Sequence, residues 1–228
     1  MVSSRPAKNF ALGDAAPTLI PAKGAAREGR SEEATGGYHP PNGRFELVTV
    51  PPRHYLMIDG HGDPNTSPVY AEALAALFPL AYAVKFVSKN LGRDYVVMPL
   101  QGLWWADDMT AFTTRRDKST WHWTLLNLLP DWITPEHVDA ARAAVAAKGA
   151  APSTAVRLEV LDEGLCVQTM HLGPYDDEGP VLQRLHDEFV PEHGLSLHGR
   201  HHEIYLGDVR RTAAERLRTI LRQPVQRS

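Results

Sequence analysis

The feature that most constrains the fold is one order of elements that occurs in both halves of the chain. Each half is predicted as a strand, an acidic loop with glycine, a helix and two further strands, and the copies lie about 110 residues apart. The segments at 57–63 and 169–175 align loosely. A shared order of this kind indicates an internal duplication of a βαββ unit. We therefore predict an α+β fold of two tandem repeats, at about 45–130 and 155–225.

Two such repeats define where a ligand would bind. Each sheet is expected to pack one face on its own helix and to turn the other face toward its twin. A cleft on the pseudo-twofold axis follows from this arrangement, and ligands commonly occupy such clefts.

Helix boundaries give the clearest local signals. Ser67 with Pro68, and Thr134 with Pro135, combine an N-cap residue with proline in the first turn. Pro79 lies inside the first helix and should kink or interrupt it. The predicted helices span about 68–89, 135–148 and 178–192. The predicted strands span about 46–50, 54–60, 99–106, 120–129, 156–161, 165–172, 200–206 and 217–223, with the pair 156–161 and 165–172 joined by a turn at 162–164.

Residues 1–42 are rich in Ala, Gly, Pro, Ser and charged residues and show no sustained period. Such a segment buries too little apolar surface to offset the entropy of ordering it. We predict a disordered or loosely docked tail at 1–42, followed by one folded domain at 43–228.

Composition excludes several classes of protein. A formal net charge of −3 does not fit a nucleic-acid-binding protein, which would present a basic face. One cysteine, Cys166, excludes an intramolecular disulfide and fits a reducing compartment. No apolar run approaches the roughly 20 residues that span a bilayer, and no secretory signal is recognisable at the N-terminus. We expect a cytoplasmic protein without nucleic-acid or membrane partners; the oligomeric state is left open.

Several segments carry a family resemblance. They are GLCVQ at 164–168, HLGPYDDE at 171–178, HHEIYLGD at 201–208, and RRT at 210–212 running on to LRQPV at 221–225. Together they resemble the stand-alone GyrI-like small-molecule-binding family, and the resemblance extends less sharply back to about residue 45. Val209 stands where relatives usually have Pro, and Gly207 where they often have Ser.

The resemblance implies a tandem βαββ (SHS2-like) fold, shared with effector-binding domains of multidrug-responsive transcription regulators. It further implies that some stand-alone members are cyclopropanoid hydrolases. These enzymes open the strained cyclopropane of DNA-alkylating natural products by adding water, which gives detoxification or antibiotic resistance without a cofactor.

The strand at 200–206 holds the candidate catalytic base. Period-two alternation places Ile204 on the face expected to meet the helices, and His201, Glu203 and Tyr205 on the face expected to line the cleft. Desolvation among aromatic groups raises the pKa of a carboxylate and makes it a better base, so we predict that Glu203 activates a water molecule. Alternatively, Glu203 recognises a cationic drug or pairs with an arginine.

Tryptophans indicate a flat ligand. Trp121 and Trp123 share one face of their strand, and stacked aromatic walls bind planar polycycles. Trp104 and Trp105 point to opposite faces, so at most one of them lines the cleft, and we assign this role to Trp105. Core packing is the alternative for each tryptophan.

The loop at 173–177 supplies the predicted hydrogen-bond donor. Tyr175 is assigned to stabilise the oxyanion that forms as the ring opens, with anchoring of the loop as the alternative. His171, His201 and Tyr205 are predicted ligand contacts. No zinc-ligand spacing is present, so no metal is predicted, and Cys166 has no recognisable activating partner.

Two functions remain open. The first is cofactor-independent hydrolysis of a planar, cyclopropane-bearing electrophile. The second is a non-catalytic protein that binds or sequesters a planar aromatic molecule.

Overall fold

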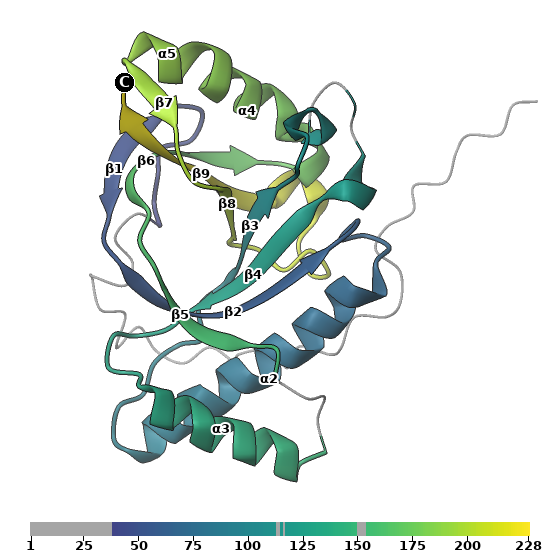
Figure 1. Ribbon diagram of the computed structural model, residues 1–228, viewed down its shortest axis with the longest axis vertical. Coiled ribbons are helices and arrows are strands. Elements are labelled where there is room, and N and C mark those ends of the chain that lie inside the picture. Colours follow the sequence, from purple (N-terminus) through teal and green to yellow (C-terminus); the bar gives the residue numbers. More distant parts are fainter. Residues whose placement is uncertain (1–37, 113–114, 116, 150–153) are drawn as a thin grey trace, which may run out of the picture.

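The computed structural model describes residues 38–112, 115, 117–149 and 154–228. Nine strands form an antiparallel sheet in the order β1-β6-β9-β8-β3-β4-β2-β5, with β7 added beside β9 (Figure 1). The strands are β1 (Glu46–Val50), β2 (Arg53–His61), β3 (Leu100–Trp105), β4 (His122–Leu128), β5 (Arg157–Leu161), β6 (Gly164–Leu172), β7 (Leu195–Leu197), β8 (His201–Tyr205) and β9 (Arg218–Arg227).

Two groups of helices pack on the sheet. The first comprises α2 (Pro68–Asn90) and α3 (Pro135–Ala147), and the second runs from α4 (Gly179–Arg184) through a π-helical turn (Leu185–Phe189) to α5 (Val190–Glu192). Figure 1 shows them at opposite ends of the molecule, with α2 and α3 below the strands and α4 and α5 above. The predicted bounds of these helices and of the strands agree with the structure to within a few residues, whereas the short strand β7 was not predicted.

The strand order is symmetric about the β3–β8 pair. The first strand of each predicted repeat pairs with a strand of the other repeat. Strand β1 pairs with β6 of the second half, and β5 pairs with β2 of the first half. The predicted pairing of the segments at 156–161 and 165–172 is therefore wrong, because β5 and β6 lie at different ends of the sheet. Pro51 and Pro52 have no N–H groups, which favours an extended connection from β1 to β2 over a hairpin.

Register shows that both helical groups cover the same face of the sheet. Ile58, Leu125, Gly102, Glu203 and Leu221 lie opposite one another on adjacent strands and so form one row across the sheet. This face packs against α2 and α3 at one end and against the π-helical turn and α5 at the other. We call it the helix face.

The other face of the sheet encloses a second core, centred on Leu126, Ile204 and Ile220. A buried charged network continues from it, in which Glu163 lies 2.8 Å from Nδ1 of His202 and 3.1 Å from Nη1 of Arg222. Burial alone raises the pKa of Glu163, but His202 and then Arg222 outweigh burial and lower it to about 2.

Packing begins earlier in the chain than the sequence indicated. Tyr38, a residue of the predicted tail, is only 4% exposed in this second core and accepts a hydrogen bond from Nε2 of Gln101. Asn42 forms an isolated bridge with Met170. The rest of the predicted tail, residues 1–37, lies outside the described residues.

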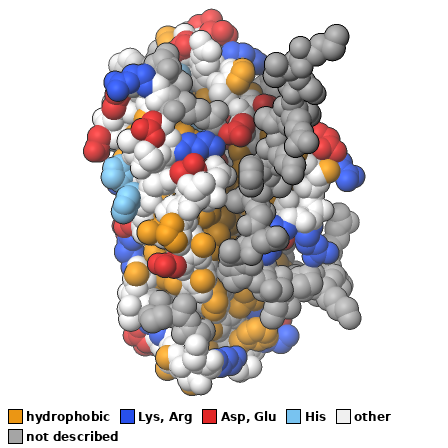
Figure 2. Space-filling view, turned by 90° about the vertical axis from the view of Figure 1, so that its right-hand side faces the viewer, with side chains coloured by type: hydrophobic (Ala, Val, Ile, Leu, Met, Phe, Trp, Pro, Cys, Tyr) orange, Lys and Arg blue, Asp and Glu red, His pale blue; other side chains and the backbone are white. Residues whose placement is uncertain are grey.

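Helix α2 continues through Pro79, so the interruption that the sequence allowed there is absent. By length and composition alone it is also apolar enough to cross a membrane, although no apolar run of that length was predicted from the sequence. Leu77, Leu80 and Val84 are fully buried against the sheet and α3, as expected for a core helix. Figure 2 shows that hydrophobic side chains gather in the middle and lower part of one side of the molecule.

Candidate functional site

The helix face of β3 and β8 carries the candidate site. Glu203 and Tyr205 lie on this face, and Tyr205 packs against the α2 core, whereas Ile204 belongs to the opposite core. The predicted placement of Ile204 against the helices and of Glu203 on a face without helices is therefore wrong. Both faces of these strands are largely buried, so alternation separated the two sets of residues without showing which set meets the helices.

A chain of hydrogen bonds fixes the Glu203 carboxylate. The Tyr205 hydroxyl donates to Oε2 of Glu203 at 2.7 Å, and Nε1 of Trp104 donates to the same hydroxyl oxygen at 2.9 Å. Burial, followed by the charge of Glu203, raises the pKa of Tyr205 well above its ordinary value. Tyr205 therefore remains a protonated donor at neutral pH.

Glycines make room for the indoles beside this chain. An ideal Cβ at Gly102 would lie 2.7 Å from Nε1 of Trp104, so the indole crosses the strand where a side chain is missing. An ideal Cβ at Gly60 would lie 2.0 Å from the ring of Trp123. Any other residue at either position would displace the indole that covers it.

Further aromatic rings surround Glu203 and Tyr205. Tyr70 of α2 stacks on Trp104 with 6.4 Å between ring centroids, and Tyr175 meets Tyr205 edge-on at 5.3 Å. Trp121 stacks on Phe112 at 4.3 Å and lies edge-on to Trp104. We call Tyr70, Trp104, Trp121, Tyr175, Glu203 and Tyr205 the Glu203 cluster. It places one carboxylate among several aromatic rings.

Two further polar groups lie close to the cluster. His201 is mostly buried and neither ring nitrogen has a hydrogen-bond partner among the described residues; its Nε2 lies 3.6 Å from Oε1 of Glu203. Glu178, just before α4, is 5% exposed. Burial and then the charges of Glu178 and Glu203 raise the pKa of Tyr175, which places both carboxylates within electrostatic reach of its hydroxyl.

An ion pair joins the two loops that flank the cluster. Nζ of Lys118 lies 3.1 Å from Oδ1 of Asp176 and 5.7 Å from the ring centroid of Trp121. Lys118 belongs to the loop before β4 and Asp176 to the loop that carries Tyr175. The loops of the two halves of the chain therefore meet beside Trp121 and Tyr175.

The structure gathers most, but not all, of the predicted site residues. Glu203, Tyr175, Tyr205, His201 and Trp121 lie together, as described above. Trp105 lies on the opposite face of β3, where it stacks on His122 and the Arg200 guanidinium covers its ring. Trp105 therefore does not lie beside Glu203.

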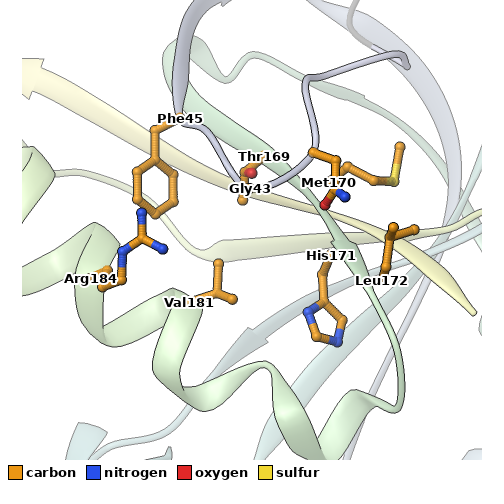
Figure 3. Close-up of a pocket in the computed structure, with 9 residues that line it drawn as sticks. Gly43, Phe45, Thr169, Met170, His171, Leu172, Val181 and Arg184 are labelled. Carbon is orange, nitrogen blue, oxygen red and sulfur yellow. The ribbon is translucent and has the colours of Figure 1, made fainter. Parts of the chain in front are cut away.

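Two other predicted ligand contacts lie elsewhere. Trp123 is on the helix face but is fully buried, with the edge-on ring of Tyr70 against it. His171 lies on β6, two strands away from β8, and lines a separate pocket (Figure 3).

Sequence reasoning missed Tyr70, Trp104 and Glu178. No local pattern marks Tyr70 as more than a residue of its helix, or Glu178 as more than one charge of the acidic run at 176–178. Trp104 had been weighed against Trp105, and only the register of β3 decides between them. Among the described residues, no cluster of histidine, cysteine and carboxylate side chains has the arrangement of a metal site.

The chain is similar to known proteins over nearly all of its folded part. Residues 44–226 match the family described as GyrI-like small molecule binding domain. An uncharacterized conserved protein from Listeria innocua is 34% identical, with a TM-score of 0.77 over 86% of this chain and 98% of its own. A hydrolase from the same organism is 33% identical, with a TM-score of 0.75 over 86% of this chain and 97% of its own.

More distant likeness concerns the fold alone. The EcmrR C-terminal domain is 12% identical, with a TM-score of 0.54 over 81% of this chain and 98% of its own. No curated protein matches the chain. The family match and the one-third identity to the Listeria proteins show that this chain is an α+β member of the GyrI-like small-molecule-binding family.

Proposed function

We propose that the chain is a cytoplasmic, cofactor-independent hydrolase that opens the cyclopropane ring of a planar electrophile bound at the Glu203 cluster. The observation that supports this proposal most directly is the hydrogen bonding of the Glu203 carboxylate. Its Oε2 accepts a hydrogen bond from Tyr205, while its Oε1 accepts none from the described residues and lies 3.6 Å from Nε2 of His201, which makes Oε1 the oxygen proposed to take a proton from water. A general base needs an oriented oxygen of this kind.

The proposed reaction adds one water molecule. The water oxygen forms a bond to a ring methylene carbon while Glu203 takes the proton. The strained carbon–carbon bond breaks, and its electron pair moves through the conjugated ring onto the carbonyl oxygen, which becomes a phenolate. A hydroxyl donor such as Tyr175 stabilises that charge, and the phenolate is finally protonated.

The proposed ligand lies between the halves of the chain, which we interpret as tandem βαββ repeats. The symmetric strand order supports this placement, because β3 and β8 meet at its centre and carry Trp104 and Glu203. Aromatic faces at Tyr70, Trp121 and Tyr175 suit a planar ring system and exclude water from the rest of the ligand.

Relatives support the hydrolase class but not its substrate. Two solved structures described as hydrolases from Listeria innocua are 32% and 33% identical to this chain. The cyclopropane-bearing substrate rests on the resemblance of the segments around 164–178 and 201–212 and on the aromatic character of the site.

Binding without turnover is the second candidate. A carboxylate beside several aromatic rings also recognises a lipophilic cation, through charge and cation–π attraction. In that case Glu203 would be an anchor and no bond would break.

Turnover in ¹⁸O-labelled water separates the two candidates. The protein is incubated with a cyclopropane-bearing, duocarmycin-type compound and the products are analysed by mass spectrometry. Catalytic incorporation of one labelled oxygen into the ligand supports the hydrolase. Stoichiometric binding with an unchanged ligand would contradict hydrolysis and favour sequestration.

A further inference from the structure

A pocket lies on the helix face, at the outer end of the sheet away from Glu203. It has a volume of about 340 Å³ and lies between β6, the segment before β1, and α4 (Figure 3). This volume falls within the range of small-molecule sites. We call it the Arg184 pocket.

The Arg184 pocket is separate from the Glu203 cluster. His171 lines the pocket, and the row across the sheet runs from His171 through Thr219 of β9 to Tyr205 of β8. Thr219 is fully buried between them. A ligand in this pocket would thus occupy a different place from the proposed substrate.

The lining of the pocket has one sign of charge. Arg184 is the exposed cation of α4, and no aspartate or glutamate is among the lining residues. The Arg184 guanidinium lies 5.4 Å from the ring centroid of Phe45, and no described carboxylate forms an ion pair with it. Figure 3 shows the guanidinium reaching from the helix toward that ring. An arginine in this setting is suited to bind a carboxylate through paired N–H donors.

The rest of the lining is apolar. Phe45 and Val181 supply the apolar side chains on the helix face, whereas Met170 and Leu172 alternate with His171 along β6 and point to the other face of the sheet. His171 is held in the wall, because its Nε2 donates to the carbonyl oxygen of Pro174 at 3.0 Å. An apolar body of a ligand would cover Val181 and the ring of Phe45.

From this lining, we propose that the Arg184 pocket binds an organic monocarboxylate with a medium-length alkyl or aryl body. The carboxylate pairs with Arg184, and the body lies against Phe45 and Val181. This site is independent of the proposed hydrolysis.

The test uses octanoate as the probe and the ¹⁵N-labelled full chain. Octanoate is expected to shift the amide signals of Thr169, Val181 and Arg184 in a saturable way, and the Glu203→Gln variant should bind it equally well. Octanol and octylamine, which share the alkyl body, should bind at least tenfold more weakly. Arg184→Gln should weaken octanoate binding about tenfold or more. Arg227→Gln, which removes an exposed arginine at the end of β9, should leave it unchanged.

A second variant tests the pocket itself. Val181→Trp fills the cavity from α4 and should abolish binding while the protein remains folded by circular dichroism. The proposal is overturned if octanoate causes no saturable shifts, if octylamine binds as well, or if Arg184→Gln or Val181→Trp leaves the affinity unchanged. Since none of these measurements depends on turnover, their failure would not be confused with failure of the proposed hydrolysis.

Discussion

The Tyr205 hydroxyl donates a 2.7 Å hydrogen bond to Oε2 of Glu203, which lies two residues earlier on the same strand. Residues two apart on a strand share a face, so the backbone of β8 holds donor and acceptor together. Trp104 on the adjacent strand completes the chain by donating to the Tyr205 oxygen. The carboxylate is thus oriented before any ligand arrives.

Tyr205→Phe should impair turnover more than binding. The change removes the hydroxyl that orients Glu203, so we expect kcat to fall roughly tenfold to a hundredfold with KM changed by less than about threefold. Loss of the hydrogen bond should cost about 1 kcal/mol of unfolding free energy. Steady-state kinetics and urea denaturation measure both quantities; an unchanged kcat would show that Tyr205 does not position Glu203.

Gly102→Ala should disturb the site through Trp104. The added Cβ would lie 2.7 Å from Nε1 and 3.1 Å from Cε2 of the indole, so the indole must move away from Tyr205. We expect a loss of about 1–3 kcal/mol in unfolding free energy and weaker ligand binding. Gly179→Ala is the matched control, because no atom lies within 4 Å of its Cβ position. Equal stability of the two variants would contradict the role given to Gly102.

Substitution of Trp121 should affect ligand binding, whereas substitution of Trp123 should affect the stability of the fold. Trp121 is half-buried within the Glu203 cluster, so Trp121→Leu should weaken binding of a planar ligand about fivefold to tenfold at little cost in stability. Trp123 is fully buried, so Trp123→Leu should instead lower the unfolding free energy by about 3 kcal/mol. Calorimetric titration and urea denaturation provide the two readouts. The reverse pattern would show that Trp123, and not Trp121, faces the ligand.

Glu163→Gln should change how stability depends on pH. The pKa of Glu163 is lowered from its ordinary 4.5 to about 2, so its ionised form stabilises the folded state. That contribution is fully present above about pH 4.5 and is lost as pH falls toward 2. At pH 7 the variant should be less stable by about 3 kcal/mol, because Arg222 and His202 lose a buried partner.

The comparison is made by urea denaturation of both proteins at pH 7 and at pH 3. The stability difference between them should shrink at the lower pH. A difference that stays constant from pH 7 to pH 3 would contradict the depressed pKa of Glu163.

The order of elements was predictable because local signals agreed. Ser67 with Pro68, and Thr134 with Pro135, mark the starts of α2 and α3 in the structure, as their sequence predicted. Pro79 did not interrupt α2, whose buried face packs on the sheet and on α3. Packing of a long apolar helix can outweigh the missing hydrogen bond at a proline.

The composition of the site was less predictable than the fold, because it depends on long-range register. Alternation in β8 grouped His201, Glu203 and Tyr205 correctly, yet it could not show that their face is the helix face. Whether Trp104 or Trp105 shares a face with Glu203 depends on the register between β3 and β8. In that register Gly102 lies opposite Glu203, which puts Trp104 on the same face. That pairing joins residues about 100 positions apart, and no local pattern encodes it.

The most direct test of the central claim compares the wild-type chain with Glu203→Gln on one cyclopropane-bearing ligand. Binding is measured by calorimetric titration, and addition of water by mass spectrometry under single-turnover conditions. The account predicts that the variant binds with a Kd within about threefold of wild type and forms hydrated product at least a hundredfold more slowly. Hydrated product formed at the wild-type rate by the variant would contradict the role of Glu203 as the base.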